Sequence, residues 1–301
     1  MLRLSNRTRK NLLIGLVLLL PGILFFKAIL LDTYIQGRDG ILRDKNVLPV
    51  FLSKYIDREL DYSWANENRF IAHALGGIEG FSYTNSKEAF IKNYAVGHRV
   101  FEVDLIFTAD EKLVCSHGWN NYVSPPNLID FLNTKIQGTF TPLALIDLFI
   151  LLRDYPDTFL VTDTKSFKKN DVRSTFQAII DTANGLAPEI LERIIPQIYS
   201  EKMLKYIEEI YPFNSYIYTL YLSRSSKQRV IDFATENGIR VITMPKHRIS
   251  SKSDSKIFIN TLKKKRIYTY LHPINEKKEI LFFETYGPWG FYTAFLAPEP
   301  L

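Results

Sequence analysis

At residues 101–105 the chain reads Phe101-Glu102-Val103-Asp104-Leu105, a short run in which apolar and acidic residues alternate. The alternation predicts a β-strand, and because successive side chains of a strand point to opposite faces, Glu102 and Asp104 share one face. Two carboxylates on one face are suited to a hard divalent cation, which prefers oxygen ligands. His117-Gly118 ends the next apolar run and adds an imidazole to the same region.

Two further strand-like runs end in residues of the same chemical kinds. Residues 70–77 are apolar around His73 and close on glycines, and residues 158–165 end with Asp163 and Lys165, which share a face because they are two apart. The candidate residues therefore lie at the ends of successive strands separated by helical runs. A (β/α)8 barrel assembles its active site in this way, at the carboxyl ends of its strands.

The coarse alternation along the chain also predicts a TIM-type barrel. Nine strand-like runs exceed the eight of a barrel, so we expect 98–107 and 112–117 to form a hairpin with His117 on a loop above the second barrel strand. Thr141-Pro142 predicts the start of a helix, and Asn237-Gly238 the end of another. The strand-like runs lie at 70–75, 98–107, 112–117, 158–165, 193–199, 215–221, 239–245, 266–273 and 290–296, and the helix-like runs at 84–94, 141–153, 170–184, 201–210, 225–237, 254–264 and 276–285.

Short motifs occur in a fixed order over roughly residues 70–295. They are His73 with Gly76 or Gly77, Asn85-Ser86-Lys87-Glu88-Ala89-Phe90, Glu102-Val103-Asp104-Leu105, Leu113-Val114-Cys115-Ser116-His117-Gly118, Thr162-Asp163-Thr164-Lys165, Pro196-Gln197-Ile198-Tyr199 and Gly287-Pro288-Trp289-Gly290-Phe291-Tyr292-Thr293. The ordered set resembles the glycerophosphodiester phosphodiesterase and phosphatidylinositol phospholipase C-like superfamily. The Asp-x-Lys form with His-Gly resembles its compact bacterial members and the phospholipase D toxins. The arginine that follows the first histidine in the family is replaced by Ala74, and Lys165 can supply the missing phosphate-binding charge.

The resemblance implies roles for particular residues. It implies that Glu102, Asp104 and Asp163 bind Mg²⁺ or Ca²⁺, and that His73 and His117 act as acid and base, for which an imidazole with a near-neutral pKa is suited. The candidate substrate-binding residues are Lys165, Gln197 and His272, the last at the end of a late strand.

The activity implied is metal-dependent cleavage of a P–O bond in a glycerophosphodiester, a phospholipid or a glycerol-phosphate polymer. The product is either open or a cyclic phosphate, according to whether water or a substrate hydroxyl attacks. A catalytically silent barrel that binds phosphorylated lipid or polymer is the alternative suggested by Ala74. A sugar hydrolase needs a facing pair of carboxylates, but it needs neither two histidines nor a lysine.

The amino-terminal region predicts membrane attachment. Residues 12–31 are apolar except for Lys27, and twenty helical residues span about 30 Å, the thickness of the hydrocarbon core of a bilayer. The basic tail at 1–11 predicts a cytoplasmic amino terminus, a juxtamembrane linker at 32–69 and a barrel at 70–301 on the extracytoplasmic side. A cleaved signal peptide is the alternative for this segment.

Composition bounds these expectations. A chain of 301 residues with 46% hydrophobic and 23% charged residues can form one barrel domain, and its net charge of +6 suits an anionic surface or substrate. The basic run 263–266 lacks interleaved aromatic residues and lies at the end of a predicted helix, so we expect no nucleic-acid binding. The lone Cys115 excludes an intrachain disulfide. The sequence gives no indication of an oligomeric state.

Overall fold

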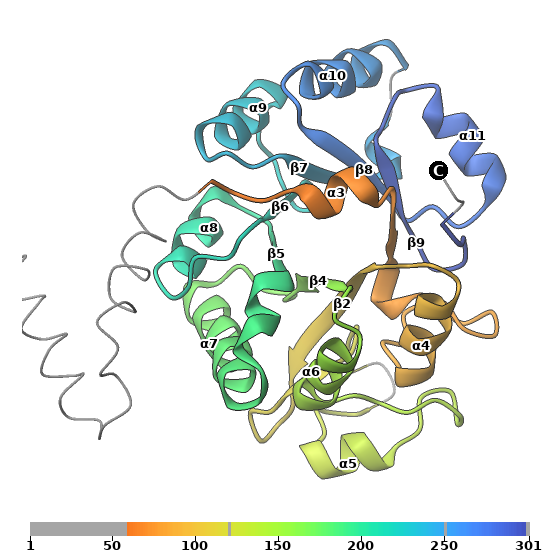
Figure 1. Cartoon of the computed structure of the whole chain (residues 1–301), viewed down its shortest axis with the longest axis vertical. Coiled ribbons are helices and arrows are strands. Elements are labelled where there is room, and N and C mark those ends of the chain that lie inside the picture. The colour runs from red at the N-terminus through yellow and green to blue at the C-terminus, as the bar shows by residue number, and fades with distance from the viewer. Residues whose placement is uncertain (1–58, 120–121, 250–251, 299–301) are drawn as a thin grey trace, which may run out of the picture. The chain divides into compact units, whose positions relative to one another are not determined.

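Eight parallel strands close into a barrel in the computed structural model, which describes residues 59–119, 122–249 and 252–298 (Figure 1). The strand order is β1-β9-β8-β7-β6-β5-β4-β2, and pairing of β1 with β2 closes the ring. These strands are β1 (Phe70–Ala72), β2 (Val100–Phe107), β4 (Phe159–Asp163), β5 (Ile194–Ile198), β6 (Ile217–Thr219), β7 (Val241–Pro245), β8 (Tyr268–His272) and β9 (Gly290–Thr293). The predicted TIM-type barrel is confirmed.

One further strand, β3 (Leu113–Cys115), lies outside the barrel and forms the second arm of a hairpin with β2. β3 runs antiparallel to the carboxyl end of β2, with Leu105 opposite Cys115 and Phe107 opposite Leu113. The hairpin predicted from the surplus of strand-like runs is therefore confirmed. It brings the segment after β3 back toward the barrel mouth, because the Ser116 N–H donates to the Asp104 carbonyl at 3.0 Å.

Helices surround the barrel, as Figure 1 shows. Among the described residues, four helices begin with a side-chain cap, in which Ser86, Asn127, Ser200 or Ser226 accepts a hydrogen bond from the first turn. The helices are α3 (Ser63–Glu67), α4 (Lys87–Ala95), α5 (Leu128–Asn133), α6 (Leu145–Asp154), α7 (Lys169–Leu186), α8 (Glu201–Glu208), α9 (Lys227–Glu236), α10 (Lys252–Lys264) and α11 (Lys277–Glu284), with 3-10 turns η1 (His73–Leu75), η2 (Pro188–Arg193) and η3 (Lys246–Arg248).

The helix start predicted at Thr141-Pro142 is wrong. Residues 141–144 instead continue beside β3, where the Cys115 N–H donates to the Leu143 carbonyl at 2.9 Å. The helix begins at Leu145, because the Asp147 carboxylate accepts a hydrogen bond from the Ala144 N–H at 3.0 Å. The end predicted at Asn237-Gly238 is confirmed, since α9 stops at Glu236 and Gly238 has φ +65°.

Alternation along β2 separates the core from the site. Phe101, Val103 and Leu105 pack in the layer between barrel and helices, whereas Val100 packs inside the barrel. Glu102 and Asp104 continue the inward face of Val100 toward the carboxyl end of the strand. The inside of the barrel is thus apolar at its amino end and acidic at its carboxyl end.

The amino end of the barrel is covered by the segment that contains α3. The Tyr62 hydroxyl donates to the Tyr216 carbonyl at 3.1 Å, and the Trp64 indole N–H donates to Ser215 Oγ at 3.0 Å. Both aromatic side chains are buried, and the compact unit begins at Glu59. The barrel unit therefore starts earlier than the predicted boundary at residue 70.

The remaining amino-terminal predictions concern residues outside the described part of the chain. These are the basic tail, the apolar span at 12–31 and most of the predicted linker. Within the described residues no helix combines the length and the apolar character needed to cross a membrane.

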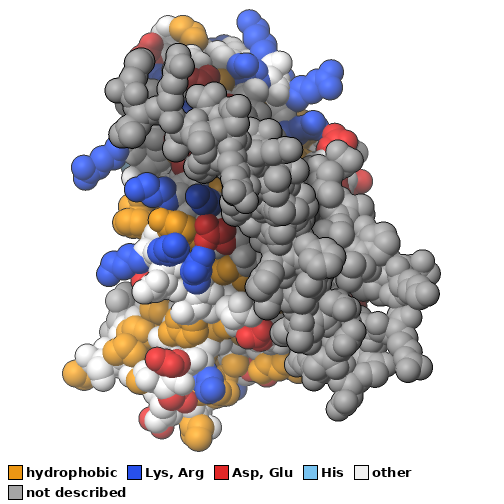
Figure 2. Space-filling model, turned by 90° about the vertical axis from the view of Figure 1, so that its left-hand side faces the viewer, with side chains coloured by type: hydrophobic (Ala, Val, Ile, Leu, Met, Phe, Trp, Pro, Cys, Tyr) orange, Lys and Arg blue, Asp and Glu red, His pale blue; other side chains and the backbone are white. Residues whose placement is uncertain are grey.

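On the side of the molecule that Figure 2 shows, the described basic, acidic and apolar side chains are interspersed.

Candidate active site

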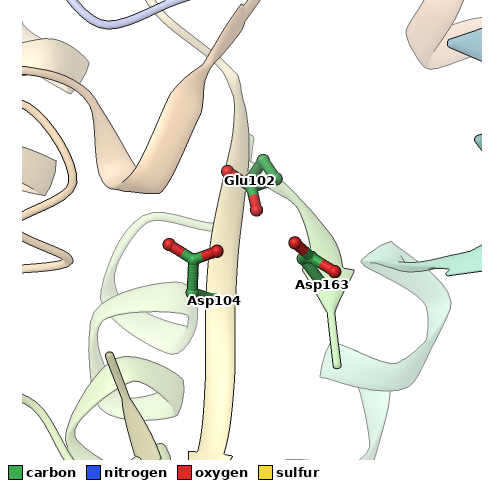
Figure 3. Close-up of side chains that lie close together, drawn as sticks. All are labelled: Glu102, Asp104 and Asp163. Carbon is green, nitrogen blue, oxygen red and sulfur yellow. The ribbon is translucent and has the colours of Figure 1, made fainter. Parts of the chain in front are cut away.

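Three buried carboxylates meet at the carboxyl end of the barrel. Glu102 and Asp104 come from β2, and Asp163 is the last residue of the neighbouring strand β4, in register with Asp104. One oxygen from each lies within 4.8 Å of the others, and the three point toward one another in Figure 3. At most 8% of any of the three residues is exposed. Such a cluster is costly unless cations compensate its charge.

Lys165 supplies one compensating charge. Its Nζ lies 2.5 Å from Asp104 Oδ1 and 2.7 Å from Asp163 Oδ2. Burial disfavours the charged form of Lys165, but the nearby carboxylates outweigh that effect and raise its pKa. The side chain predicted to contact substrate phosphate therefore stands between two of the three candidate metal ligands.

Asn85 fixes the position of Asp104. Its side-chain amide donates to Asp104 Oδ2 at 2.8 Å, and its side-chain carbonyl accepts the Asp104 backbone N–H at 3.0 Å. Burial opposes ionisation of Asp104, yet the charge and hydrogen bond of Lys165 and the hydrogen bond from Asn85 lower its pKa. Asp104 is therefore an ionised carboxylate held from two sides.

Glu102 and Asp163 have the opposite tendency. Burial, reinforced by the charges of Asp104 and Asp163, raises the pKa of Glu102 well above its ordinary range. Burial also raises the pKa of Asp163, against the opposing charge of Lys165. One lysine thus does not balance three carboxylates, whereas a lysine and a divalent cation together do.

Ala74, which stands where the family resemblance leads us to expect an arginine, contacts the site through its backbone. Ala74 is fully buried with φ +52°, and its backbone N–H donates to Glu102 Oε2 at 2.7 Å. The peptide group therefore orients the glutamate directly.

Two histidines flank the carboxylates, with a tyrosine between them. His73 Nε2 lies 3.7 Å from Glu102 Oε2, and His117 is exposed on the loop after β3. The ring of Tyr83 has its centroid 4.8 Å from that of His73 and 4.9 Å from that of His117. Burial lowers the pKa of His73 to about 4, so its imidazole is unprotonated at neutral pH.

These residues share one cavity of about 260 Å³. Gln197 lines it from β5 and accepts a hydrogen bond from the Tyr292 hydroxyl at 3.2 Å. His272 lines it from the end of β8, where burial lowers the pKa of the imidazole to about 3 and its Nε2 has no hydrogen-bond partner among the described residues. All the predicted site residues except Asp104 line this cavity, and Asp104 lies behind it in the carboxylate cluster.

Sequence reasoning did not assign a site role to Tyr83, Asn85 or Tyr292. In the sequence Asn85 stands out only as part of the motif at the start of a helix. The signal for Tyr83 and Asn85 is their place between a strand-end histidine and the capped start of α4, on a loop that must return over the barrel mouth.

The carboxylate cluster fits a divalent metal. It offers hard oxygen ligands, and Asp163 Oδ1 is buried without a hydrogen-bond partner among the described residues. An unpartnered buried carboxylate oxygen is costly, and coordination to a cation would satisfy it.

Comparison with solved structures places this geometry in a known fold. A glycerophosphodiester phosphodiesterase from Parabacteroides distasonis is 13% identical and matches 76% of this chain and 93% of its own, with a TM-score of 0.62. A phosphodiesterase from Oleispira antarctica in complex with the product sn-glycerol-3-phosphate is 12% identical and matches 77% and 95%, with a TM-score of 0.61. The chain has the glycerophosphodiester phosphodiesterase fold.

A third solved structure agrees with the first two. The glycerophosphodiester phosphodiesterase of Thermotoga maritima is 15% identical and matches 75% of this chain and 94% of its own, with a TM-score of 0.51. No protein-family model and no curated protein matches the sequence. The predicted resemblance to this phosphodiesterase superfamily is therefore supported at the level of the fold, and the resemblance to phospholipase D toxins is not shown.

Proposed function

We propose that this chain is a divalent-cation-dependent phosphodiesterase that cleaves a P–O bond in a glycerophosphodiester, a phospholipid or a glycerol-phosphate polymer. The observation that carries the proposal is the meeting of three buried carboxylates with His73 and His117 at the carboxyl end of a barrel with this fold. The barrel end where strands deliver their last residues is where enzymes of this architecture place catalytic groups.

Glu102, Asp104 and Asp163 would hold the cation. A bound Mg²⁺ or Ca²⁺ supplies polarisation of the phosphoryl oxygens and offsets the charge that develops on them in the transition state. Asn85 and the Ala74 N–H hold two of the carboxylates in place. Lys165 can turn its ammonium from the carboxylates to a phosphate oxygen, since its side chain is 29% exposed at the cavity.

The histidines divide the proton transfers between them. His73, with its pKa of about 4, is unprotonated at neutral pH and can accept a proton from the attacking water or substrate hydroxyl. Glu102, whose Oε2 lies 3.7 Å from His73 Nε2, would stabilise the resulting imidazolium. His117, exposed at the mouth, would return a proton to the leaving alkoxide.

A catalytically silent barrel is the second candidate, and the ion pairs of Lys165 favour it. An ammonium that stays bound to Asp104 and Asp163 would occupy the place of a cation and leave a binding site without chemistry. The two candidates differ in whether any substrate is consumed.

The test is a hydrolysis screen with the full chain, in Mg²⁺ or Ca²⁺ and in a chelator. Its substrates are a glycerophosphodiester, a lysophospholipid and a glycerol-phosphate polymer, and phosphorus NMR separates open from cyclic phosphate products. Metal-dependent turnover of one class supports the enzyme. Metal-dependent binding of a phosphodiester without turnover of any substrate would establish the silent barrel.

The proposal includes a membrane anchor at 12–31, with the barrel on the extracytoplasmic side. It is supported by the apolar length of the segment and by the basic residues before it, Arg3, Arg7, Arg9 and Lys10. Protease added to intact cells or spheroplasts should digest the barrel. Complete protection of the barrel would refute this topology.

A further inference from the structure

Exposed apolar side chains gather at the end of the barrel that holds the site. Among the described residues, six of the fourteen large apolar side chains that are exposed lie on loops that follow β1, β4, β6 and β9. We call these six the apolar rim: Phe81, Tyr83, Phe167, Tyr221, Leu222 and Phe295. Of these fourteen described side chains, only Val96 lies on a loop at the opposite end of the barrel.

The apolar rim is continuous with the mouth of the site. Tyr83, Tyr221 and Leu222 line the catalytic cavity and are also at least 40% exposed. Phe167 follows Lys165 by two residues and is 54% exposed. The rim side chains come from four separate loops, so their exposure is a common feature of this end of the barrel and not a property of one segment.

Cations accompany the rim. Within the described parts of the loops that carry it, Lys168 and Arg224 are exposed, and Glu79 is the one exposed acid. Arg248, on the neighbouring turn η3, donates a hydrogen bond to the Ser223 carbonyl and so lies beside Leu222. Among the described residues none of these three cations has a carboxylate oxygen within 4.0 Å, so their charge is available to an external anion.

An apolar patch bordered by unpaired cations matches a lipid bilayer with anionic head groups, because the apolar side chains enter the interface while the cations meet the phosphates. We propose that the apolar rim, with Lys168, Arg224 and Arg248, docks the site end of the barrel on such a bilayer. The docking does not require catalysis. If the proposed function holds, docking draws the substrate from the lipid surface and favours a phospholipid over a free glycerophosphodiester.

The test reads the local environment of the rim in the full chain. Phe167→Cys and Leu222→Cys each carry an environment-sensitive fluorophore, and Ile257→Cys on the outer helix α10, 61% exposed, is the matched control. The only native thiol, Cys115, is fully buried and so is protected from the label. Each protein is mixed with vesicles of three parts phosphatidylcholine to one part phosphatidylglycerol, with and without brominated acyl chains.

Labels at 167 and 222 should shift to the blue and be quenched by brominated chains, while the label at 257 should do neither. The label at 257 is carried by the same full chain, so any effect of the amino-terminal residues binding to the vesicle is present in the control as well. Lys168→Gln and Arg224→Gln, each combined with the label at 222, should lower the ratio of docked to undocked rim about fivefold per cation.

Equal signals at 167, 222 and 257 would overturn the inference, and so would signals indifferent to phosphatidylglycerol and to both charge removals. A blue shift that grows with protein concentration without vesicles would assign the rim to contact with a second copy instead. Docking without turnover in the substrate screen would leave this inference intact and refute the proposed function. Turnover without docking would do the reverse.

Discussion

Replacing Asn85 with alanine should weaken metal binding although all three candidate metal ligands are kept. Asn85 makes two hydrogen bonds to Asp104, at 2.8 and 3.0 Å, and contacts neither Glu102 nor Asp163 through a hydrogen bond. Loss of a group that orients a ligand costs roughly 10- to 100-fold in metal affinity, or about 1.4–2.8 kcal/mol. Calorimetric titration with Mg²⁺ and Ca²⁺ measures this change.

The same change should also lower stability, and its size can be worked from the structure. A hydrogen bond to a charged group contributes about 1.5–3 kcal/mol and one between neutral groups about 1 kcal/mol. Asn85 has φ +48°, where alanine costs roughly 1 kcal/mol more than asparagine. The sum, about 3.5–5 kcal/mol, is below the stability of most domains, so the variant should still fold. Urea unfolding gives the measured value.

Asn93 provides the control. It is also buried and makes two hydrogen bonds from its amide, to the Gly77 carbonyl at 3.1 Å and the Ala89 carbonyl at 2.8 Å, but none to a carboxylate of the described residues. Asn93→Ala should destabilise the barrel by about 2 kcal/mol, because it loses two hydrogen bonds between neutral groups, and it should bind metal as the wild type does. If both variants lost metal affinity equally, or if Asn85→Ala kept wild-type affinity, the reasoning would be refuted.

Three further outcomes follow from the site and the core. His73→Ala and His117→Ala should each lower kcat by roughly 10²–10⁴-fold with little change in KM, and wild-type kcat in both would remove their assigned roles. Lys165→Ala should raise KM and lower kcat together in steady-state kinetics, because a phosphate contact exists before and during the reaction; an effect on neither would exclude that contact. Burial lowers the pKa of His98 to about 4 from 6.5, so the unfolded chain binds more protons between these values and stability falls as pH drops from 6.5 toward 4. The wild type should therefore lose more stability than His98→Gln when the pH is lowered from 7 to 5, by about 2 kcal/mol. Urea unfolding at pH 7 and pH 5 measures this, and an equal change of the midpoint in the wild type and in His98→Gln would contradict it.

The sequence predicted those parts of the molecule that depend on local periodicity. The alternation at 101–105 placed Glu102 and Asp104 on one face, and the surplus strand-like run was the return arm of the hairpin. The carboxyl ends of the strands in a closed parallel barrel all lie at the same end of the barrel. Residues distant in the chain could therefore be assigned to one site from the sequence alone.

Contacts that depend on neighbouring strands and on loop paths were beyond this reasoning. The spacing of Asp163 and Lys165 gave a shared face, but the ammonium also reaches Asp104 because β2 and β4 pair with Asp104 opposite Asp163. Tyr83 and Asn85 reach the site through left-handed backbone, with φ +59° and +48°. Non-glycine residues adopt that conformation when tertiary packing holds them, which no local pattern reveals.

Metal reconstitution tests the central claim most directly. The full chain is stripped with a chelator, and phosphodiester hydrolysis is measured as Mg²⁺ or Ca²⁺ is returned, beside calorimetric occupancy, in the wild type and in Glu102→Gln, Asp104→Asn and Asp163→Asn. The account predicts no turnover in the stripped protein, recovery that follows occupancy, and weakened recovery in all three variants. Full turnover after stripping, or metal affinity unchanged in all three variants, would contradict it.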